Sequence, residues 1–233
     1  MSSSLLPLTS VADSAQHSGL SFGAHRTRWQ DAWEVVEAAN LPNLGLCLDS
    51  FNTLALEWAD PYSPTGTLSS DVDEKLAKNM AELVARVPGD RIFFFQVADG
   101  RKMDPPLPPP TDLTIPRLRP WSRSSRLFPL EKGLGAYLPV EVFADAVVRT
   151  GYSGPWSLEV FNDSLAGTSA KVPEEHASRA MKGIKRAVEE CYARDAAESE
   201  SPVPSSSEKT VRPVSSSQPP PSTSYREGTR SRL

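Results

Sequence analysis

The chain has 233 residues, a formal net charge of −4 and two cysteines, Cys47 and Cys191. This length is sufficient for one domain with a hydrophobic core, and the acidic balance argues against a surface that binds nucleic acid. Two cysteines do not make a disulfide framework, so we expect a cytoplasmic location. No segment has the length and apolar character of a membrane span, and the first residues lack the features of a signal peptide, so we expect no membrane partner.

The two ends of the chain differ in composition from the middle. Residues 196–233 are rich in Ser and Pro and nearly free of large apolar side chains. Such a segment cannot bury enough surface to offset its chain entropy, so we expect a disordered tail. Residues 1–21 form a separate N-terminal segment, which leaves residues 22–195 as the expected folded domain.

The first half of this domain predicts two helices and two strands. Trp29, Trp33 and Val36 recur at helical spacing and predict a helix over residues 28–39. The apolar run at residues 44–48 predicts a buried strand. A loop punctuated by Pro and Gly is expected at residues 52–70, before a second helix that Pro88 and Gly89 bring to an end. Residues 91–97 predict the second strand.

The second half begins with an irregular stretch. Residues 99–138 are Pro-rich and without periodicity, and loops of this length in compact domains are usually functional or disordered. Pro139 opens a helix, residues 156–161 predict a strand, and residues 173–194 predict a last helix. That helix is expected to place His176 in solvent and these residues inward: Ala177, Ala180, Ile184, Ala187, Val188 and Cys191. The alternation of helices and strands predicts a parallel sheet with right-handed crossovers.

Each of the three predicted strands carries one oxygen-bearing side chain near its end. Asp49 ends the first strand, Gln96 lies near the end of the second, and Glu159 interrupts the third. Because the carboxyl ends of parallel strands meet at one edge of a sheet, these side chains are expected to converge on a hard divalent cation. The alternatives are a helix cap for Asp49 and a satisfied core amide for Gln96. Glu159 is the stronger signal, since a buried unpaired carboxylate is costly.

Four runs of residues carry a resemblance to a known family. They are residues 45–51 (GLCLDSF), 95–107 (FQVADGRKMDPPL), 121–129 (WSRSSRLFP) and 156–162 (WSLEVFN). In this order and spacing they resemble the 3-dehydroshikimate dehydratases of quinate and shikimate catabolism, which are xylose isomerase-like (AP endonuclease family 2) barrels. The resemblance extends over about residues 22–188. It implies an α/β fold, the C-terminal half of a (β/α)8 TIM barrel with about three to four βα units.

The resemblance also implies an activity and a site. The reaction is the loss of water from 3-dehydroshikimate to give protocatechuate. A divalent cation (Mn, Mg, Co or Zn) held by Asp49, Gln96 and Glu159 would polarise the ring ketone while a base removes the adjacent proton. His25 is the candidate base, and its alternative is a polar residue at a helix start.

Three further residues are candidates for substrate binding. Arg123 and Arg126 suit the substrate carboxylate, because a guanidinium group matches carboxylate geometry; the alternative is a solvated basic loop. Asn52 lies three residues after Asp49, where some relatives carry a catalytic His. An amide cannot replace that base, so base catalysis from this position is not expected.

One position departs from the pattern of the relatives. Ser18 stands where they carry the first liganding Glu, and about half a barrel that precedes this point in the relatives is not present. We therefore expect a truncated chain with an impaired dehydratase site. Two alternatives stay open: a barrel enzyme resembling a sugar isomerase, and a non-catalytic barrel remnant.

Overall fold

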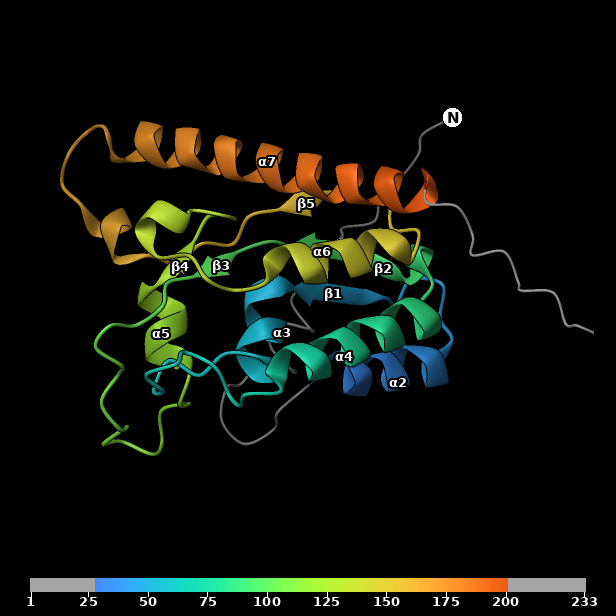
Figure 1. Ribbon diagram of the computed structural model, residues 1–233, viewed down its shortest axis with the longest axis horizontal. Coiled ribbons are helices and arrows are strands. Elements are labelled where there is room, and N and C mark those ends of the chain that lie inside the picture. The colour runs from blue at the N-terminus through green and yellow to red at the C-terminus, as the bar shows by residue number, and fades with distance from the viewer. Residues whose placement is uncertain (1–27, 201–233) are drawn as a thin grey trace, which may run out of the picture. The chain divides into compact units, whose positions relative to one another are not determined.

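A computed structural model describes residues 28–200 of the chain (Figure 1). Its helices are α2 (Trp29–Ala39), α3 (Ser50–Glu57), α4 (Val72–Arg86), α5 (Arg119–Ser124), α6 (Val140–Arg149) and α7 (Val172–Glu200). Its strands are β1 (Leu46–Asp49), β2 (Ile92–Gln96), β3 (Asp99–Gly100), β4 (Arg126–Leu127) and β5 (Trp156–Ser157). Three single turns of 3-10 helix are η1 (Gly89–Arg91), η2 (Lys132–Leu134) and η3 (Asp163–Ala166).

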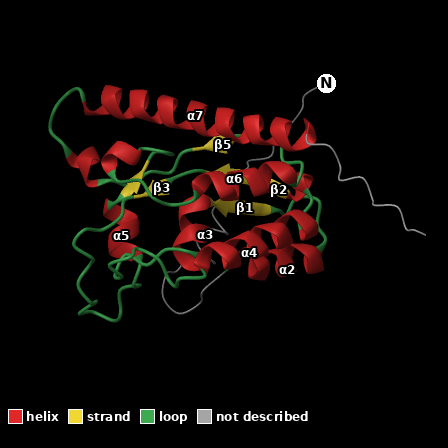
Figure 2. Ribbon diagram, viewed as in Figure 1, coloured by secondary structure: helices red, strands yellow, loops and turns green. Residues whose placement is uncertain are grey.

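A parallel sheet of three strands, in the order β1–β2–β5, organises these elements. Asp49 of β1 pairs with Gln96 of β2, and Gln96 pairs with Ser157 of β5. The three strands therefore end at the same level. Strands β3 and β4 form a separate antiparallel pair just beyond that end of the sheet (Figure 2).

Helices pack around the sheet and bury its apolar side chains. Helix α2 contacts β1, and α6 contacts α3, α4 and α7, with α7 running alongside α6 (Figure 1). Phe51, Phe95, Phe143 and Trp121 are fully buried, and Phe95 meets Phe143 edge to face at 5.7 Å between ring centroids. These aromatic side chains remove a large apolar area from water, which is the main stabilising contribution to a core of this kind. Among residues 28–200 we find no helix with the length and apolar character of a membrane span.

The predicted parallel α/β architecture is confirmed, with three parallel strands connected through helices. Helices α2, α4 and α6 fall where the apolar spacing predicts them. Their predicted inward faces are buried, including Trp33 of α2, Leu76 of α4 and Phe143 of α6. Hydrophobic spacing was sufficient here because each helix has one apolar and one polar face.

Five details differ from the predictions. Residues 50–57 form helix α3 where a loop is expected, and β5 covers only Trp156–Ser157. His176 is only 8% exposed, because its ring packs against Phe128 and its Nε2 lies 3.1 Å from Ser164 Oγ. Ala177 is exposed instead. Helix α7 continues to Glu200, beyond the expected end at residue 194, and the rest of the expected tail lies outside the described residues.

Candidate active site

Asp49 lies at the junction between β1 and α3. Its Oδ1 accepts a hydrogen bond of 2.9 Å from the Asn52 backbone N–H, and its Oδ2 accepts one of 2.8 Å from Asn52 Nδ2. Asp49 is therefore the N-cap of α3, where a carboxylate satisfies a free backbone donor and interacts favourably with the helix dipole. It is 5% exposed, so its remaining charge requires a partner within the fold.

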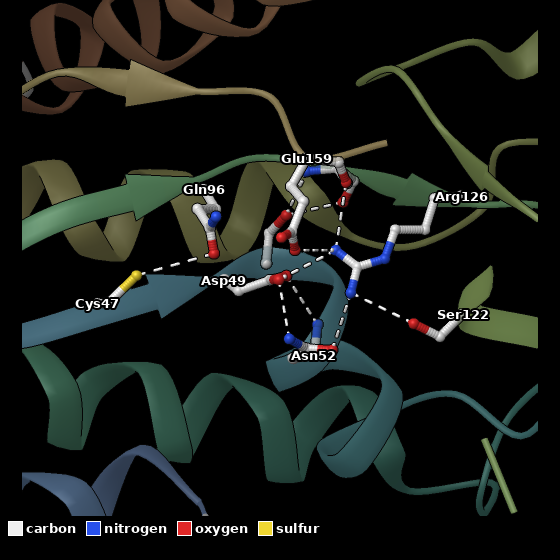
Figure 3. A network of polar contacts seen from close by, with 9 residues as sticks. Cys47, Asp49, Asn52, Gln96, Ser122, Arg126 and Glu159 are labelled. Carbon is white, nitrogen blue, oxygen red and sulfur yellow. Dashed lines mark hydrogen bonds and ion pairs between the residues drawn. The ribbon is translucent and has the colours of Figure 1, made fainter. Parts of the chain in front are cut away.

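That partner is Arg126 of β4 (Figure 3). Arg126 Nη1 lies 3.0 Å from Asp49 Oδ2 and 3.1 Å from Glu159 Oε2, and it also donates to the Glu159 backbone carbonyl at 3.2 Å. Nη2 donates to Asn52 Oδ1 at 3.1 Å and to Ser122 Oγ at 3.3 Å. One guanidinium group thus joins β1, α3, α5 and the segment after β5. We call these three charged residues the Asp49–Arg126–Glu159 triad.

The backbone near residue 126 determines where this guanidinium lies. Arg126 N–H donates to the Phe161 carbonyl at 3.0 Å, and Asn162 Nδ2 donates to the Arg126 carbonyl at 2.8 Å. Ser125 and Asn162 form an antiparallel bridge. These contacts join residues 125–126, at the end of α5, to residues 161–162. Arg126 and Glu159 therefore lie on two neighbouring backbone segments that are hydrogen-bonded to each other.

The electrostatics of the site reflect two carboxylates in a partly dry environment. Burial raises the pKa of Glu159, Arg126 opposes that shift, and the neighbouring Asp49 carboxylate raises the pKa again. Burial, with Asp49 and Glu159 nearby, raises the pKa of the Cys47 thiol to about 12. Cys47 is therefore a neutral thiol at physiological pH and not an activated nucleophile.

Gln96 belongs to the same end of the sheet. It is 9% exposed, and its Oε1 accepts a weak hydrogen bond from Cys47 Sγ at 3.7 Å. In Figure 3 its side chain lies above Cys47, on the same side of the sheet as Asp49 and Glu159. The structure thus brings the three candidate ligands to the same end of the sheet, where the hydrogen bond of Gln96 Oε1 is with Cys47.

The other predicted site residues have different positions. Arg123 is exposed and stacks over the Phe161 ring at 4.7 Å, whereas Arg126 is buried. Asn52 is buried between Asp49 and Arg126. His25 and Ser18 lie outside the described residues. Sequence reasoning missed Ser122, whose only signal is its spacing of four residues before Arg126.

The comparisons with known proteins agree with this architecture. Residues 13–192 match the family described as xylose isomerase-like TIM barrel. The chain belongs to this family. The expected family and fold class are thereby confirmed, and the three parallel strands of the described residues are the part of a TIM barrel that residues 28–200 form.

Relatives of this xylose isomerase-like barrel chain include curated 3-dehydroshikimate dehydratases. The one from Neurospora crassa is 39% identical over 155 residues, which are 65% of this chain and 43% of the relative. Those from Pseudomonas aeruginosa and Pseudomonas putida are 34% and 32% identical over 149 residues, 64% of this chain and 18% of each relative. The chain therefore spans less than half the length of the curated relatives that it matches.

Two solved structures are also similar. One is a xylose isomerase-like TIM barrel/4-hydroxyphenylpyruvate dioxygenase fusion protein, 29% identical, with a TM-score of 0.49 over 76% of this chain and 22% of that one. The other is the IOLI protein with a bound zinc atom, 20% identical, with a TM-score of 0.45 over 68% of this chain and 42% of that one.

The donor atoms of the site fit a hard divalent cation in their chemical type. Mg²⁺ and Mn²⁺ prefer carboxylate and amide oxygens, which Asp49, Glu159 and Gln96 provide. Only two of these are charged, and within residues 28–200 no three His, Cys, Asp or Glu side chains form a cluster that could hold a metal. Arg126 also occupies hydrogen-bonding positions on both carboxylates.

Proposed function

We propose that this chain binds 3-dehydroshikimate and is a metal-dependent dehydratase that converts it to protocatechuate by loss of water. The observation that carries the proposal is the convergence of Asp49 and Glu159 at the carboxyl end of a parallel sheet in a chain 39% identical to a 3-dehydroshikimate dehydratase. Active sites of barrel enzymes lie at that end of the strands. Both cysteines are free, which agrees with a cytoplasmic location as part of the proposal.

The proposed roles follow from where each group lies. Asp49, Gln96 and Glu159 would hold the divalent cation, which supplies a Lewis acid for the ring ketone oxygen. Arg123 is the proposed contact for the substrate carboxylate, because its guanidinium is exposed while lying over Phe161. Arg126 and Asn52 would contact substrate only after giving up bonds within the site. His25 is the proposed base.

We further propose that turnover by this chain is slow. By the resemblance described above, Asn52 provides an amide where some relatives carry a catalytic His, and Ser18 stands where they carry a liganding Glu. The Arg126 guanidinium already neutralises part of the charge that a cation would meet. A second candidate function follows from the same residues: the chain binds an anionic ring without converting it.

The test is an assay of the purified chain with 3-dehydroshikimate and Mn²⁺ or Mg²⁺, in which protocatechuate is followed by its absorbance. We expect slow turnover that requires the cation and that falls at least about 100-fold in Glu159→Gln, since removal of a catalytic group typically costs that much. The control is Asp163→Asn, which changes an exposed carboxylate four residues further along and should leave the rate unchanged.

Three results separate the candidates. Binding of 3-dehydroshikimate without protocatechuate formation would favour the binding module. No binding by either variant or by the unaltered chain would contradict both functions. Turnover that persists in chelator would contradict the metal dependence while leaving the dehydratase assignment in place.

A further inference from the structure

Arg126 occupies the part of the site that a cation would need. Its Nη1 is 3.0 Å from Asp49 Oδ2 and 3.1 Å from Glu159 Oε2. A divalent cation held by the same two residues would have to approach carboxylates whose inner side faces this nitrogen (Figure 3). The Arg126 guanidinium and a divalent cation would therefore need the same position between the Asp49 and Glu159 carboxylates.

The arginine is built into this position. It is 2% exposed, and its guanidinium lies over the Phe51 ring at 4.5 Å and near the Phe161 ring at 5.3 Å. Asn52 Oδ1 and Ser122 Oγ accept hydrogen bonds from Nη2. Five protein oxygens and two aromatic faces thus surround one guanidinium, which is more than a surface arginine at a chance contact would have.

Charge repulsion prevents both cations from sharing these oxygens. Two positive groups a few ångströms apart repel strongly where water is excluded, and the triad is almost dry on the Arg126 side. Asp49 Oδ2 already accepts hydrogen bonds from both Asn52 Nδ2 and Arg126 Nη1, so this oxygen has no lone pair left for a cation. A cation can bridge Asp49 Oδ2 and Glu159 Oε2 only after Nη1 has moved away from them.

We propose that Arg126 is the resident counter-cation of this site and competes directly with the divalent cation for Asp49 and Glu159. The inference rests on the proposed metal site and adds what controls its occupancy: the affinity for metal is lowered by the cost of displacing Arg126. One feature of the arginine reduces that cost. Arg126 Nε has no hydrogen-bond partner among the described residues, so displacement breaks the bonds of the two Nη atoms alone.

The experiment measures Mn²⁺ binding without substrate, by the loss of the free Mn²⁺ signal in electron paramagnetic resonance. Arg126→Met keeps an unbranched side chain of similar length and removes the charge. We expect it to bind Mn²⁺ at least about 10-fold more tightly than the unaltered chain, a change equivalent to about 1.4 kcal/mol. The matched control is Arg123→Met, which removes an exposed charge that also acts on Glu159. Its affinity should stay within about 3-fold of the unaltered chain, because exposed charges are screened.

A second measurement on the unaltered chain covers the case in which Arg126→Met fails to fold. The Nη–H resonances of Arg126 should be separate and slowly exchanging in chelator, since the group is held by five oxygens. Saturating Mg²⁺ should merge them as the guanidinium is released. Equal Mn²⁺ affinity in Arg126→Met and the unaltered chain, or Mg²⁺ binding that leaves these resonances unchanged, would overturn the proposal.

These readouts are independent of catalysis. Tight Mn²⁺ binding by Arg126→Met without protocatechuate formation would contradict the proposed dehydratase while supporting the competition. Absence of Mn²⁺ binding by both chains at millimolar concentration would contradict the competition, and the assay with 3-dehydroshikimate would still decide the function.

Discussion

At the scale of single residues, buried carboxylates in this chain are stabilised in two ways. Asp49 and Glu159 share a guanidinium, whereas Asp99 is surrounded by backbone N–H groups. Asp99 is fully buried, and its Oδ1 accepts hydrogen bonds from Gly100 at 2.8 Å, Tyr137 at 3.1 Å and Leu138 at 3.0 Å. Its Oδ2 accepts one from Leu130 at 3.3 Å. One side chain therefore connects the two ends of the long segment between β2 and α6.

Replacement of Asp99 by Asn should destabilise the fold. An amide has one acceptor oxygen, so its NH₂ group would face either Leu130 N–H or the three donors on the other side. A buried donor that loses its acceptor costs about 1–3 kcal/mol. We expect Asp99→Asn to lower the free energy of unfolding at pH 7 by that amount in chemical denaturation. The control Asp90→Asn changes an exposed carboxylate and should have an effect below about 0.5 kcal/mol.

The same residue predicts a pH dependence. Burial raises the pKa of Asp99 from 3.8 to about 6, against the hydrogen bonds from Gly100, Leu138 and Leu130 that lower it. Between these two values the folded chain binds more protons at Asp99 than the unfolded chain, so the free energy of unfolding falls as pH rises from about 4 to about 6 and is level above. The whole change is about 3 kcal/mol at most. Asp99→Asn does not titrate, so the stability difference between the unaltered chain and the variant should decrease over this range; a constant difference would contradict the raised pKa.

At the scale of elements, spacing in the sequence predicted the helices that have two distinct faces and failed elsewhere. Helix α4 was predictable because Leu76, Met80 and Leu83 recur on one side of it. Helix α3 was not predictable from spacing, because it is short, largely buried and followed by a Pro- and Gly-rich turn. Its Asp49 cap is local, but its stability also depends on packing against α6, and that contact is not local in sequence.

Some residues of the candidate site could likewise be predicted from the sequence, and others could not. Asp49, Gln96 and Glu159 could be selected because each is a polar residue next to an apolar strand. The role of Arg126 could not be predicted, since its two charged partners lie 33 and 77 residues away in the chain and are brought together by the fold. The fold of residues 99–138 depends likewise on Asp99, whose partners Leu130 and Leu138 are 31 and 39 residues away.

The contact between η1 and the end of α6 leaves no room for a side chain at Gly89. Its N–H donates to the Thr150 carbonyl at 2.9 Å, and a Cβ atom there would overlap the backbone of Gly151 and Tyr152. Since backbone atoms cannot rotate aside, Gly89→Ala should cost about 1–3 kcal/mol of unfolding free energy. Gly133→Ala is the control, because no atom lies within 4 Å of the added methyl group. Equal thermal stability of the two variants would contradict the close approach.

Helix α7 is tied to the long segment by one ion pair. Arg179 Nε and Nη2 lie 2.7 and 2.8 Å from the two oxygens of Glu131, and Glu131 Oε2 also accepts from the Phe128 N–H at 3.0 Å. Both charged side chains are largely buried, so Arg179→Met should leave a poorly compensated carboxylate and cost about 1–2 kcal/mol in urea denaturation. Arg186→Met removes an exposed pair with Glu190 on the same helix, and we expect a loss of at most about 0.5 kcal/mol. Similar losses in the two variants would show that burial of the Glu131 pair adds nothing.

At the scale of the described fold, the order of the sheet determines where the chain is most resistant to opening. Strand β2 is paired on both sides, with β1 and with β5, and its residue Phe95 is fully buried. Residues 104–117 are instead mostly exposed and have few backbone hydrogen bonds with the rest of the described residues. Local stability follows buried contacts and protected hydrogen bonds.

Hydrogen–deuterium exchange followed by mass spectrometry should therefore show distinct exchange rates for different segments of residues 28–200. We expect the slowest exchange in peptides that cover β2, because opening them requires separation from two strands and loss of the aromatic core. Peptides that cover residues 104–117 should exchange within seconds, and β5, which pairs through two residues only, should be intermediate. Peptides from α4 serve as an internal reference, since its Leu83 is fully buried and its outer face is exposed. Exchange at residues 104–117 as slow as in β2 would mean that this segment is held by contacts that its exposure does not indicate.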